Sequence, residues 1–426
     1  MSVLIALLVP LLPLLAAFVI AVGSDRTRAV RTKLAAYPIG AAFCGAIVTL
    51  YLVATQGPIT LRLYDPASVG SFAFPIGFYV DRLSAVMMVL ISGVGSIIYT
   101  YSIRYMHQDA HEPRYLALIG GATFVLLCMV SSANLMMLFL FWQILSYLLY
   151  ILAHNHSHVG TLDGAFRTFT ILRVGDVAFL AGIVLAHSLY GTLEFQELFA
   201  RAAESTATLS LLPGVEISGA TAVTLLLFIG GMSKSAQFPM FIWLPRSLYA
   251  PTPVHALLHA GIINAGGFLI NRLAPLFGQS PATLHVVLVV GTLTAILGAT
   301  MMLTQNDIKK TLGFSTIGQM GYMIMECGLG AFSLAVFHLI AHGLFKATVF
   351  LNCGSVIHKA RQDPEFPHAD QREEEEHFSP LTWSTGFFTT LAIPLIILLA
   401  THGVLRIPLL ESQGAVIILF FIWVTS

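Results

Sequence analysis

Three ionisable side chains recur at helical spacing inside one long apolar run of this sequence. His338, His342 and Lys346 are four residues apart, and the run around them extends from about Phe332 to Ile357. Side chains four residues apart lie on the same face of a helix. A charged group at membrane depth costs roughly 3 kcal/mol or more, so it normally faces a polar interior. This histidine–lysine row predicts a hydrated line for proton or ion transfer; the alternative is a polar seam that holds helices together.

A further lysine stands near the middle of an earlier apolar run, in a stretch that disfavours a continuous helix. Gly230 and Gly231 precede Lys234, and Pro239 follows it and removes a backbone hydrogen bond. Broken helices at membrane depth occur where the backbone lines a cavity. A desolvated lysine releases its proton more readily than one in water, so we predict that Lys234 carries protons. The alternative is a kinked helix whose lysine reaches toward one membrane surface.

Two histidines begin the next apolar run and again share a helix face. His255 and His259 are four residues apart and follow Pro251 and Pro253. Histidine titrates near neutral pH, so it suits a relay between a cavity and a lysine. Zinc binding by the pair is the alternative, but the neighbouring sequence offers neither a carboxylate nor a third ligand. We therefore expect no metal site in this chain.

Polar residues in two other apolar runs complete the candidate set. Arg173 and Asp176 are three residues apart, a spacing that permits an ion pair within one helix. Such a pair has a structural role by itself, or it tunes a nearby lysine by Coulomb interaction, and both interpretations stay open. Gln143 donates and accepts hydrogen bonds but does not titrate.

The composition is that of an integral membrane protein. The chain of 426 residues is 57% hydrophobic and 10% charged, whereas a soluble domain carries about 25% charge. Its formal net charge is zero, so bulk electrostatics give no reason to expect a nucleic-acid partner. The sequence contains no nucleotide-binding loop or nucleophile elbow. We therefore expect the energy for any transport to come from an ion gradient or from a partner subunit.

Apolar runs near the roughly 20 residues that a spanning helix needs recur along the whole chain. They predict an all-α polytopic membrane protein with about 13 transmembrane helices. The runs are Val3–Val22, Leu34–Val53, Leu83–Ile103, Tyr115–Val130, Leu135–Leu152, Phe169–Leu189, Ala222–Trp243, Val254–Ile270, Leu284–Leu303, Leu312–Gly328, Phe332–Ile357, Leu381–Ala400 and Ala415–Val424.

Basic residues between these runs predict the orientation. If the chain crosses the membrane at each run, successive loops lie on alternate sides. The basic residues on one side are then Arg26, Arg28, Arg31, Lys33, Arg104, Arg114, Arg167, Arg246, Lys309, Lys310, Lys359, Arg361 and Arg372. The other side receives Arg62, Arg82, Arg201, Arg272 and Arg406. Lysine and arginine are enriched in cytoplasmic loops. We therefore expect a multi-pass protein of the cell inner (cytoplasmic) membrane whose N-terminus faces outward.

Four ordered motifs resemble one family of membrane proteins. They are Gly231–Gln237, Ala250–His259, Asp307–Gln319 and His338–Lys346, within a region from about residue 81 to residue 355. They are similar to motifs of the antiporter-like membrane subunits, which include the large proton-pumping subunits of respiratory complex I and the Mrp sodium/proton antiporters. The resemblance implies two inverted five-helix repeats, each with a broken helix, at residues 115–270 and 284–424. Residues 1–114 would form the first three transmembrane helices.

The resemblance also implies roles for single residues. Lys234 matches the broken-helix lysine that the family uses as a proton carrier, and Arg173 and Asp176 match a charged pair beside the relay. The residues that match the family's central relay are His259, His338, His342 and Lys346.

Two positions depart from the family pattern. Gln143 stands where the family has a glutamate that pairs with the broken-helix lysine. His402, after Pro394, stands near the place of a second broken-helix lysine and would form one exit of the path. Both departures favour passive proton or sodium conduction over antiport, because a glutamine brings no counter-charge to Lys234.

Three segments narrow the resemblance to one branch of the family. Leu258–Leu269, Met325–Phe332 and Gly343–Ala347 resemble the DabB branch, also called MpsA, the membrane subunit of the DAB inorganic-carbon uptake complex. The resemblance implies a cytoplasmic DabA-like partner similar to zinc-dependent β-carbonic anhydrases, with the zinc on that partner and no cofactor in this chain. This chain would be a transporter subunit, not an enzyme, and would conduct protons or sodium to energise uptake of bicarbonate or CO2. The alternatives are a proton-pumping subunit of a complex I-like NADH dehydrogenase, an Mrp-type antiporter subunit, and a membrane scaffold without conduction.

Overall fold

Helices make up most of the computed structural model, which describes residues 2–22, 27–64, 75–107, 109, 111–153, 159–212, 215–247, 251–362 and 396. The helices are α1 Ser2–Val22, α2 Arg28–Leu34, α3 Ala36–Gln56, α4 Arg82–Tyr105, α5 Glu112–Val130, α6 Leu135–Ala153, α7 Val159–Tyr190, α8 Phe195–Glu204, α9 Gly219–Lys234, α10 Trp243–Arg246, α11 Thr252–Leu257, α12 Ala265–Arg272, α13 Ala274–Phe277, α14 Pro281–Met302, α15 Ile308–Gly328 and α16 Phe332–Gln362. The four strands are β1 Ile59–Tyr64, β2 Ile76–Val80, β3 Thr208–Leu212 and β4 Val215–Ser218.

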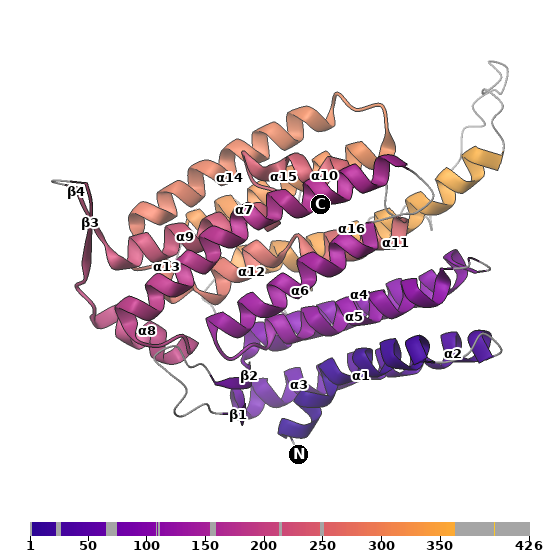
Figure 1. Cartoon of the computed structure of the whole chain (residues 1–426), viewed down its shortest axis with the longest axis horizontal. Coiled ribbons are helices and arrows are strands. Elements are labelled where there is room, and N and C mark those ends of the chain that lie inside the picture. The colour runs from indigo at the N-terminus through magenta and orange to yellow at the C-terminus, as the bar shows by residue number, and fades with distance from the viewer. Residues whose placement is uncertain are drawn as a thin grey trace.

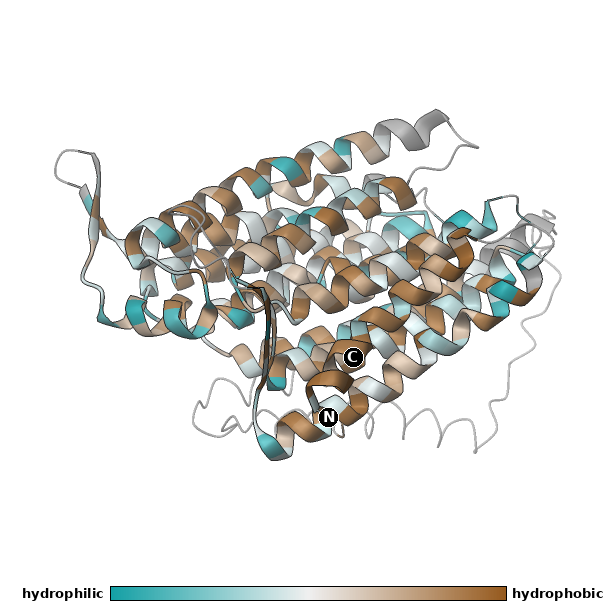
Figure 2. Ribbon diagram, turned by 60° about the horizontal axis from the view of Figure 1, so that its bottom comes forward, coloured by the Kyte–Doolittle hydropathy of each residue, from teal (hydrophilic) through white to brown (hydrophobic). Residues whose placement is uncertain are grey.

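The long helices lie side by side with their ends at two opposite faces of an elongated bundle (Figure 1). We call the face with the start of α1 and both pairs of strands the N-terminal face, and the face with α2 the opposite face. Hydrophobic residues dominate along the helices, and hydrophilic residues gather toward the two faces (Figure 2). Arg28, Arg31 and Lys33, all on α2, lie at the opposite face.

The prediction of a mostly helical, multi-pass membrane protein is confirmed. In the described part of the chain, nine helical segments are long and apolar enough to cross a membrane, and α9 is a shorter apolar helix. These nine segments do not confirm the predicted count of about 13 transmembrane helices. The predicted runs Leu381–Ala400, except for residue 396, and Ala415–Val424 lie outside the described residues. The division into two inverted repeats at 115–270 and 284–424 stays a prediction.

Several helices begin where short polar side chains cap them. Asp81 accepts a hydrogen bond from the backbone N–H of Ser84 (2.9 Å), and Asp307 accepts one from the backbone N–H of Lys310 (2.9 Å). These caps satisfy N–H groups that have no partner inside the helix. Ser218 caps α9 in the same way. The sequence therefore fixes these helix starts locally, before any packing.

Glycines let α14 and α15 approach each other closely. A Cβ atom added to Gly298 would lie 2.3 Å from the backbone nitrogen of Gly318, and one added to Gly321 would lie 2.3 Å from that of Ala295. Small residues at helix crossings allow backbones to touch in a membrane, where the lipid supplies little hydrophobic driving force. Larger side chains at these positions would push the two helices apart.

The core of the bundle surrounds α16. This helix packs against α4, α11, α12 and α15, and the segment Thr252–Arg272 beside it is completely buried. Thr252–Arg272 carries His255 and His259, and α16 carries His338, His342 and Lys346. Their polar side chains therefore face other helices of the protein rather than lipid.

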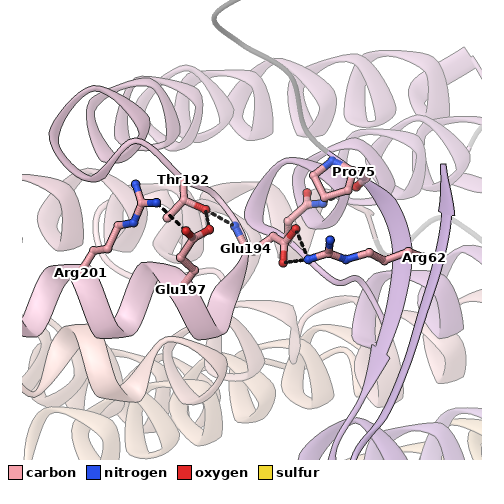
Figure 3. Close-up of polar contacts among 7 residues, drawn as sticks. Arg62, Pro75, Thr192, Glu194, Glu197 and Arg201 are labelled. Carbon is pink, nitrogen blue, oxygen red and sulfur yellow. Dashed lines mark hydrogen bonds and ion pairs between the residues drawn. The ribbon is translucent and has the colours of Figure 1, made fainter. Parts of the chain in front are cut away.

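Two antiparallel strand pairs at the N-terminal face were not predicted from the sequence. Strand β1 pairs with β2 between α3 and α4, and β3 pairs with β4 between α8 and α9. The side chain of Arg62 on β1 reaches Glu194 at the start of α8 (2.9 Å), as Figure 3 shows. Thr192 and Arg201 both hold Glu197 of α8 in the same region (Figure 3). These contacts tie α8 and the first hairpin into one cover over this face.

A third ion pair at this face joins the start of α4 to the end of α12. Arg272 donates to Asp81 (2.7 Å) and also to the hydroxyl of Ser84 (2.5 Å). Burial raises the pKa of Asp81, but the charge and hydrogen bond of Arg272 outweigh burial, so the pKa lies below its usual 3.8.

The lowered pKa of Asp81 predicts a pH-dependent contribution to stability. A carboxylate whose pKa is lower in the folded state stabilises the fold above its unfolded pKa of about 3.9, and this contribution is lost as the pH falls through the folded value. We expect Asp81→Asn, which keeps the capping oxygen, to lower the thermal midpoint in detergent at pH 7. Below about pH 4 the difference between the wild type and this variant should shrink. A difference that stays constant down to pH 3 would contradict the assignment.

Candidate functional site

The predicted break in the seventh apolar run is present and lies directly after Lys234. Helix α9 ends at this residue, and Ala236 adopts a positive φ of 49°. The chain then makes a short 3-10 turn, Met240–Ile242, before α10 begins. The indole N–H of Trp243 donates to the carbonyl of Ser233 (2.7 Å), which satisfies an acceptor near the broken end. The lysine therefore sits where the regular backbone ladder stops.

Close packing of α7 against α9 accompanies this break. A Cβ atom added to Gly175 would lie 2.0 Å from the hydroxyl of Ser233, and one added to Gly230 would lie 2.6 Å from Phe179. The glycine at position 175 thus allows α7 to pass beside the last turn of α9. As a result, the neighbouring Asp176 comes near the broken end.

The side chain of Lys234 is completely buried and is held by one tryptophan. Its Nζ donates to the backbone oxygen of Trp142 on α6 (2.6 Å) and lies 4.2 Å from the centroid of the Trp142 ring. A cation over an indole face is electrostatically favourable. The indole N–H of Trp142 in turn donates to Asp176 (2.9 Å). Trp142 therefore bridges the lysine and a carboxylate, a role that sequence reasoning missed.

The predicted ion pair within α7 is also present. Arg173 contacts Asp176 at 2.7 Å and lies over the ring of Phe169, 4.7 Å from its centroid. Arg173 also donates to the side-chain oxygen of Gln143. Gln143 is therefore oriented toward the arginine. Trp142 links Lys234 to the carboxylate of Asp176. The geometry of the Arg173–Asp176 pair is therefore compatible with both interpretations, a structural ion pair and a pair that tunes Lys234.

The helix that carries His255 and His259 contains a π-turn that the sequence did not predict. Residues Leu258–Ile262 form this wider turn between α11 and α12. π-turns are rare and occur frequently at functional sites. The ring of His259 stacks on Phe350 of α16, with centroids 4.3 Å apart and an angle of 8°. The ring of His255 lies 6.2 Å from that of His259.

The histidine–lysine row occupies one buried face of α16, as predicted. His338, His342 and Lys346 are 3%, 4% and 1% exposed, and the first two rings are 6.3 Å apart. Lys346 donates to the hydroxyl of Ser315 on α15 (2.8 Å). His259 packs against the same helix, because its ring stacks on Phe350 of α16. The structure thus brings the predicted central residues together.

A buried carboxylate, Glu326 on α15, joins this row and was missed by sequence reasoning. Its Oε1 lies 3.0 Å from Nδ1 of His338, and the residue is 0% exposed. The available signal was a single glutamate near the end of the apolar run Leu312–Gly328. That signal does not identify the partner, because the partner lies on another helix.

The candidate residues fall into two regions that meet at the break in α9. The first contains Lys234 with Trp142 and its polar neighbours, and the second contains the histidines and Lys346. Between them, the hydroxyl of Ser235 donates to the carbonyl of Ile263 (2.6 Å) and accepts from the N–H of Gly266 (3.1 Å). The broken end of α9 is therefore bonded to the segment that follows the π-turn. His402 lies outside the described residues.

Among the residues that the structure describes, no three His, Cys, Asp or Glu side chains are grouped as metal ligands.

The fold and its buried charged row define an antiporter-like membrane subunit. The family model for the transmembrane part of NADH:quinone oxidoreductase and Mrp antiporter subunits matches residues 132–425, and the model for the N-terminus of complex I chain 5 matches residues 67–116. The chain belongs to this family.

The resemblance to the DabB branch is confirmed by sequence similarity. The chain is 42% identical over 428 residues to the probable inorganic carbon transporter subunit DabB1 of Halothiobacillus neapolitanus. This alignment covers 98% of this chain and 74% of that protein. It is 36% identical over 348 residues to NADH-quinone oxidoreductase subunit L of Neisseria meningitidis, covering 80% of this chain and 51% of that subunit. The chain therefore spans about three quarters of the first relative and about half of the second.

A solved structure supports the same family. A chain in the structure of the Mrp complex from Dietzia sp. aligns with a TM-score of 0.70 and 26% identity, covering 82% of this chain and 38% of that chain. Relatives of this protein are thus subunits of larger membrane complexes.

Proposed function

We propose that this chain conducts protons or sodium ions across the membrane and thereby energises inorganic carbon uptake by a DabA-like zinc-binding partner. The name of the DabB1 relative, a probable inorganic carbon transporter subunit, supports the transported class. The chain is then a transporter subunit without an enzymatic site of its own. Zinc chemistry on CO2 or bicarbonate belongs to the partner on the cytoplasmic side.

The buried histidines of α16 and of the π-turn beside it are the observation that carries this proposal. Both ring nitrogens of His259 and of His342 are buried without a hydrogen-bond partner among the described residues. Buried polar atoms in folded proteins are nearly always hydrogen-bonded, and ionisable groups at membrane depth usually mark ion or proton pathways. Imidazole nitrogens that are not tied up by the protein are free to accept and pass on a proton.

Lys234 is the proposed proton carrier at one end of this route. Its contact with Trp142 and, through that residue, with Asp176 places a movable positive charge near a fixed negative one. Protons would pass between Lys234 and the His259–Lys346 region, and His338 and His342 would continue the path. His255, Arg173 and Gln143 support these residues, and His402 is proposed as one exit.

Orientation and location are part of the same proposal. The basic residues Arg28, Arg31 and Lys33 lie at the opposite face, and basic residues are enriched on the cytoplasmic side of membrane proteins. We propose that the opposite face is cytoplasmic, that the N-terminus is outside and that the protein resides in the cell inner membrane. The DabA-like partner would then bind at the opposite face.

The alternative function is proton pumping in a complex I-like assembly or sodium/proton antiport in an Mrp-type complex. The similarity to subunit L and to the Mrp complex supports this alternative. Gln143 contacts Arg173 and carries no charge, so the carboxylate near Lys234 is Asp176 rather than a glutamate at position 143.

Affinity purification of the tagged chain from its native membrane tests the choice between these functions. The proposal predicts one dominant cytoplasmic partner that contains zinc by elemental analysis. Co-purification of quinone-binding or iron–sulfur subunits, or of several other antiporter-like subunits, would establish the alternative. A Lys234→Ala/Lys346→Ala chain that supports full uptake would instead favour a scaffold without conduction.

The bridge between Lys234 and Asp176 predicts the effect of Trp142→Phe. This variant keeps the backbone oxygen that binds the lysine but removes the donor to the carboxylate. A hydrogen bond to a charged group is worth about 1.5–3 kcal/mol, so we expect conduction in liposomes to fall roughly tenfold or more. Tyr147→Phe, at an exposed position of the same helix, is the matched control. Equal conduction by both variants would rule out the bridge.

A further inference from the structure

A buried contact between Glu326 and His338 ends the histidine–lysine row near the N-terminal face. Glu326 and His338 are in contact at 3.0 Å, and their side chains are 0% and 4% exposed. His338 is six residues from the start of α16, or about 9 Å along the helix. A fully buried carboxylate is costly in a membrane protein and is usually retained for a function. Its second oxygen has no hydrogen-bond partner among the described residues.

A cleft opens at the N-terminal face close to this pair. It has a volume of about 440 Å³ and lies between α4, α8, α12 and the first turns of α16. Asp81 and Arg272 line one wall, and Ser333 and Val336 line the wall that α16 contributes. Helix α8 and strand β1, joined by the Arg62–Glu194 pair in Figure 3, cover the neighbouring part of the face. The cleft is lined mostly by apolar side chains, and Asp81 and Arg272 are its charged groups.

Glu326 and His338 do not line the cleft themselves, but residues that line it lie close to both of them. Val336 lines the cleft and is two residues from His338. On the other side, the amide of Asn271, which also lines the cleft, contacts the sulfur of Cys327 (3.6 Å). Cys327 is the neighbour of Glu326 in the chain. A residue that lines the cleft, or one in contact with such a residue, is thus within two chain positions of each member of the pair.

Toward the middle of the bundle, the same pair continues into the row. The ring of His342 lies 6.3 Å from that of His338, and Lys346 follows one helical turn later. Along α16 the order is therefore cleft, ion pair, central histidine and lysine. No other carboxylate among the described residues is in contact with the row.

We propose that Glu326 and His338 are the exchange point between the histidine–lysine row and the cleft at the N-terminal face. The inference rests on the proposed function, because it identifies one end of that route. One proton enters the pair from His342, is held between Nδ1 of His338 and Oε1 of Glu326, and leaves to water in the cleft. The pair then returns to its starting charge. The 3.0 Å contact lets the proton pass between the ring nitrogen and the carboxylate oxygen, and imidazole passes on protons rather than sodium ions.

Cysteine accessibility tests the route without depending on transport. Single cysteines replace Ser333, His338 or Ile324 in the full-length chain whose native cysteines are changed to alanine, and a small membrane-impermeant thiosulfonate is added to either side of the membrane. Ile324 on α15 is fully buried, does not line the cleft and is two residues from Glu326, on a different face of its helix, so it is the dry control. From the side of the N-terminal face, His338→Cys should react at least about tenfold faster than Ile324→Cys, because a thiol reacts where its thiolate is exposed to solvent. No reaction from that side would overturn the proposal.

Removing the charge of Glu326 tests its part in transfer. We expect Glu326→Gln and His338→Gln each to reduce proton conduction about tenfold or more. The double variant should conduct no more slowly than the slower of the two single variants, because the effects of substitutions in residues that act as a unit are not additive. Glu197→Gln on α8 is the control. Wild-type conduction by Glu326→Gln, or losses that multiply in the double variant, would overturn the role of the pair.

One further variant separates this inference from the proposed function. Lys346→Met should stop conduction whether or not the pair is the exchange point. Normal conduction by Lys346→Met would disprove the proposed route as a whole. Loss of conduction in Lys346→Met together with normal conduction in Glu326→Gln would disprove the exchange point alone. If Glu326→Gln does not assemble, the accessibility experiment still decides the question.

Discussion

Replacing Lys234 with a non-titrating residue should stop ion conduction while the protein still assembles. Lys234→Met keeps most of the side-chain volume but removes the proton carrier, and Lys234→Ala also removes the contact with the Trp142 ring. A positioned proton donor or acceptor contributes about 10²–10⁴-fold to the rate of a transfer step. We therefore expect conduction to fall at least about 100-fold in both variants. The measurement is acidification of liposomes that contain the purified protein with its partner, followed with a pH-sensitive dye.

The matched control for this prediction is Lys310→Ala. This lysine is exposed near the start of α15, so its loss changes the charge of the protein by the same amount without touching the buried site. Size-exclusion chromatography shows whether each variant still assembles with its partner. If cells that carry Lys234→Ala grow normally under carbon limitation, Lys234 is not part of the proton relay.

Breaking the Arg272–Asp81 pair should produce the largest loss of stability. Arg272 is 4% exposed, and besides Asp81 it contacts Ser84 and lies 5.5 Å from the ring of Phe268. Removing one partner of a buried ion pair costs about 3–5 kcal/mol, because the other charge is left without compensation. Asp81 remains partly exposed at 29%, so the lower end of this range applies. For Arg272→Met we expect the thermal midpoint in detergent to fall by roughly 5 °C or more.

An exposed pair at the same face supplies the comparison. Arg201 and Glu197 on α8 are 48% and 47% exposed, and exposed ion pairs are worth about 0–1 kcal/mol. Arg201→Met should therefore change the midpoint little. Similar shifts for Arg272→Met and Arg201→Met would mean that the buried pair does not hold α12 against α4.

Much of the helical layout follows from the sequence because apolar runs must satisfy their backbone within the helix in a membrane. The runs from Val3–Val22 to Phe332–Ile357 all contain helices of the structure. The break after Lys234 was also predictable, since two glycines and a proline surround that lysine. In contrast, the two β-hairpins lie outside the apolar runs, and their pairing depends on how the loops meet at the N-terminal face. The π-turn around His259 gives no distinct signal in apolar periodicity.

The candidate site divides in the same way. The sequence by itself determined that His338, His342 and Lys346 share a helix face, because a spacing of four residues fixes their relative direction. The tertiary structure decided which groups they meet: Glu326 for His338 and Ser315 for Lys346. It also decided that Trp142, 92 residues away in the chain, holds Lys234. The physical reason is that helical periodicity is local, whereas these partners come from other helices. How those helices approach each other depends on close contacts at glycines and on the packing of buried side chains across the whole bundle.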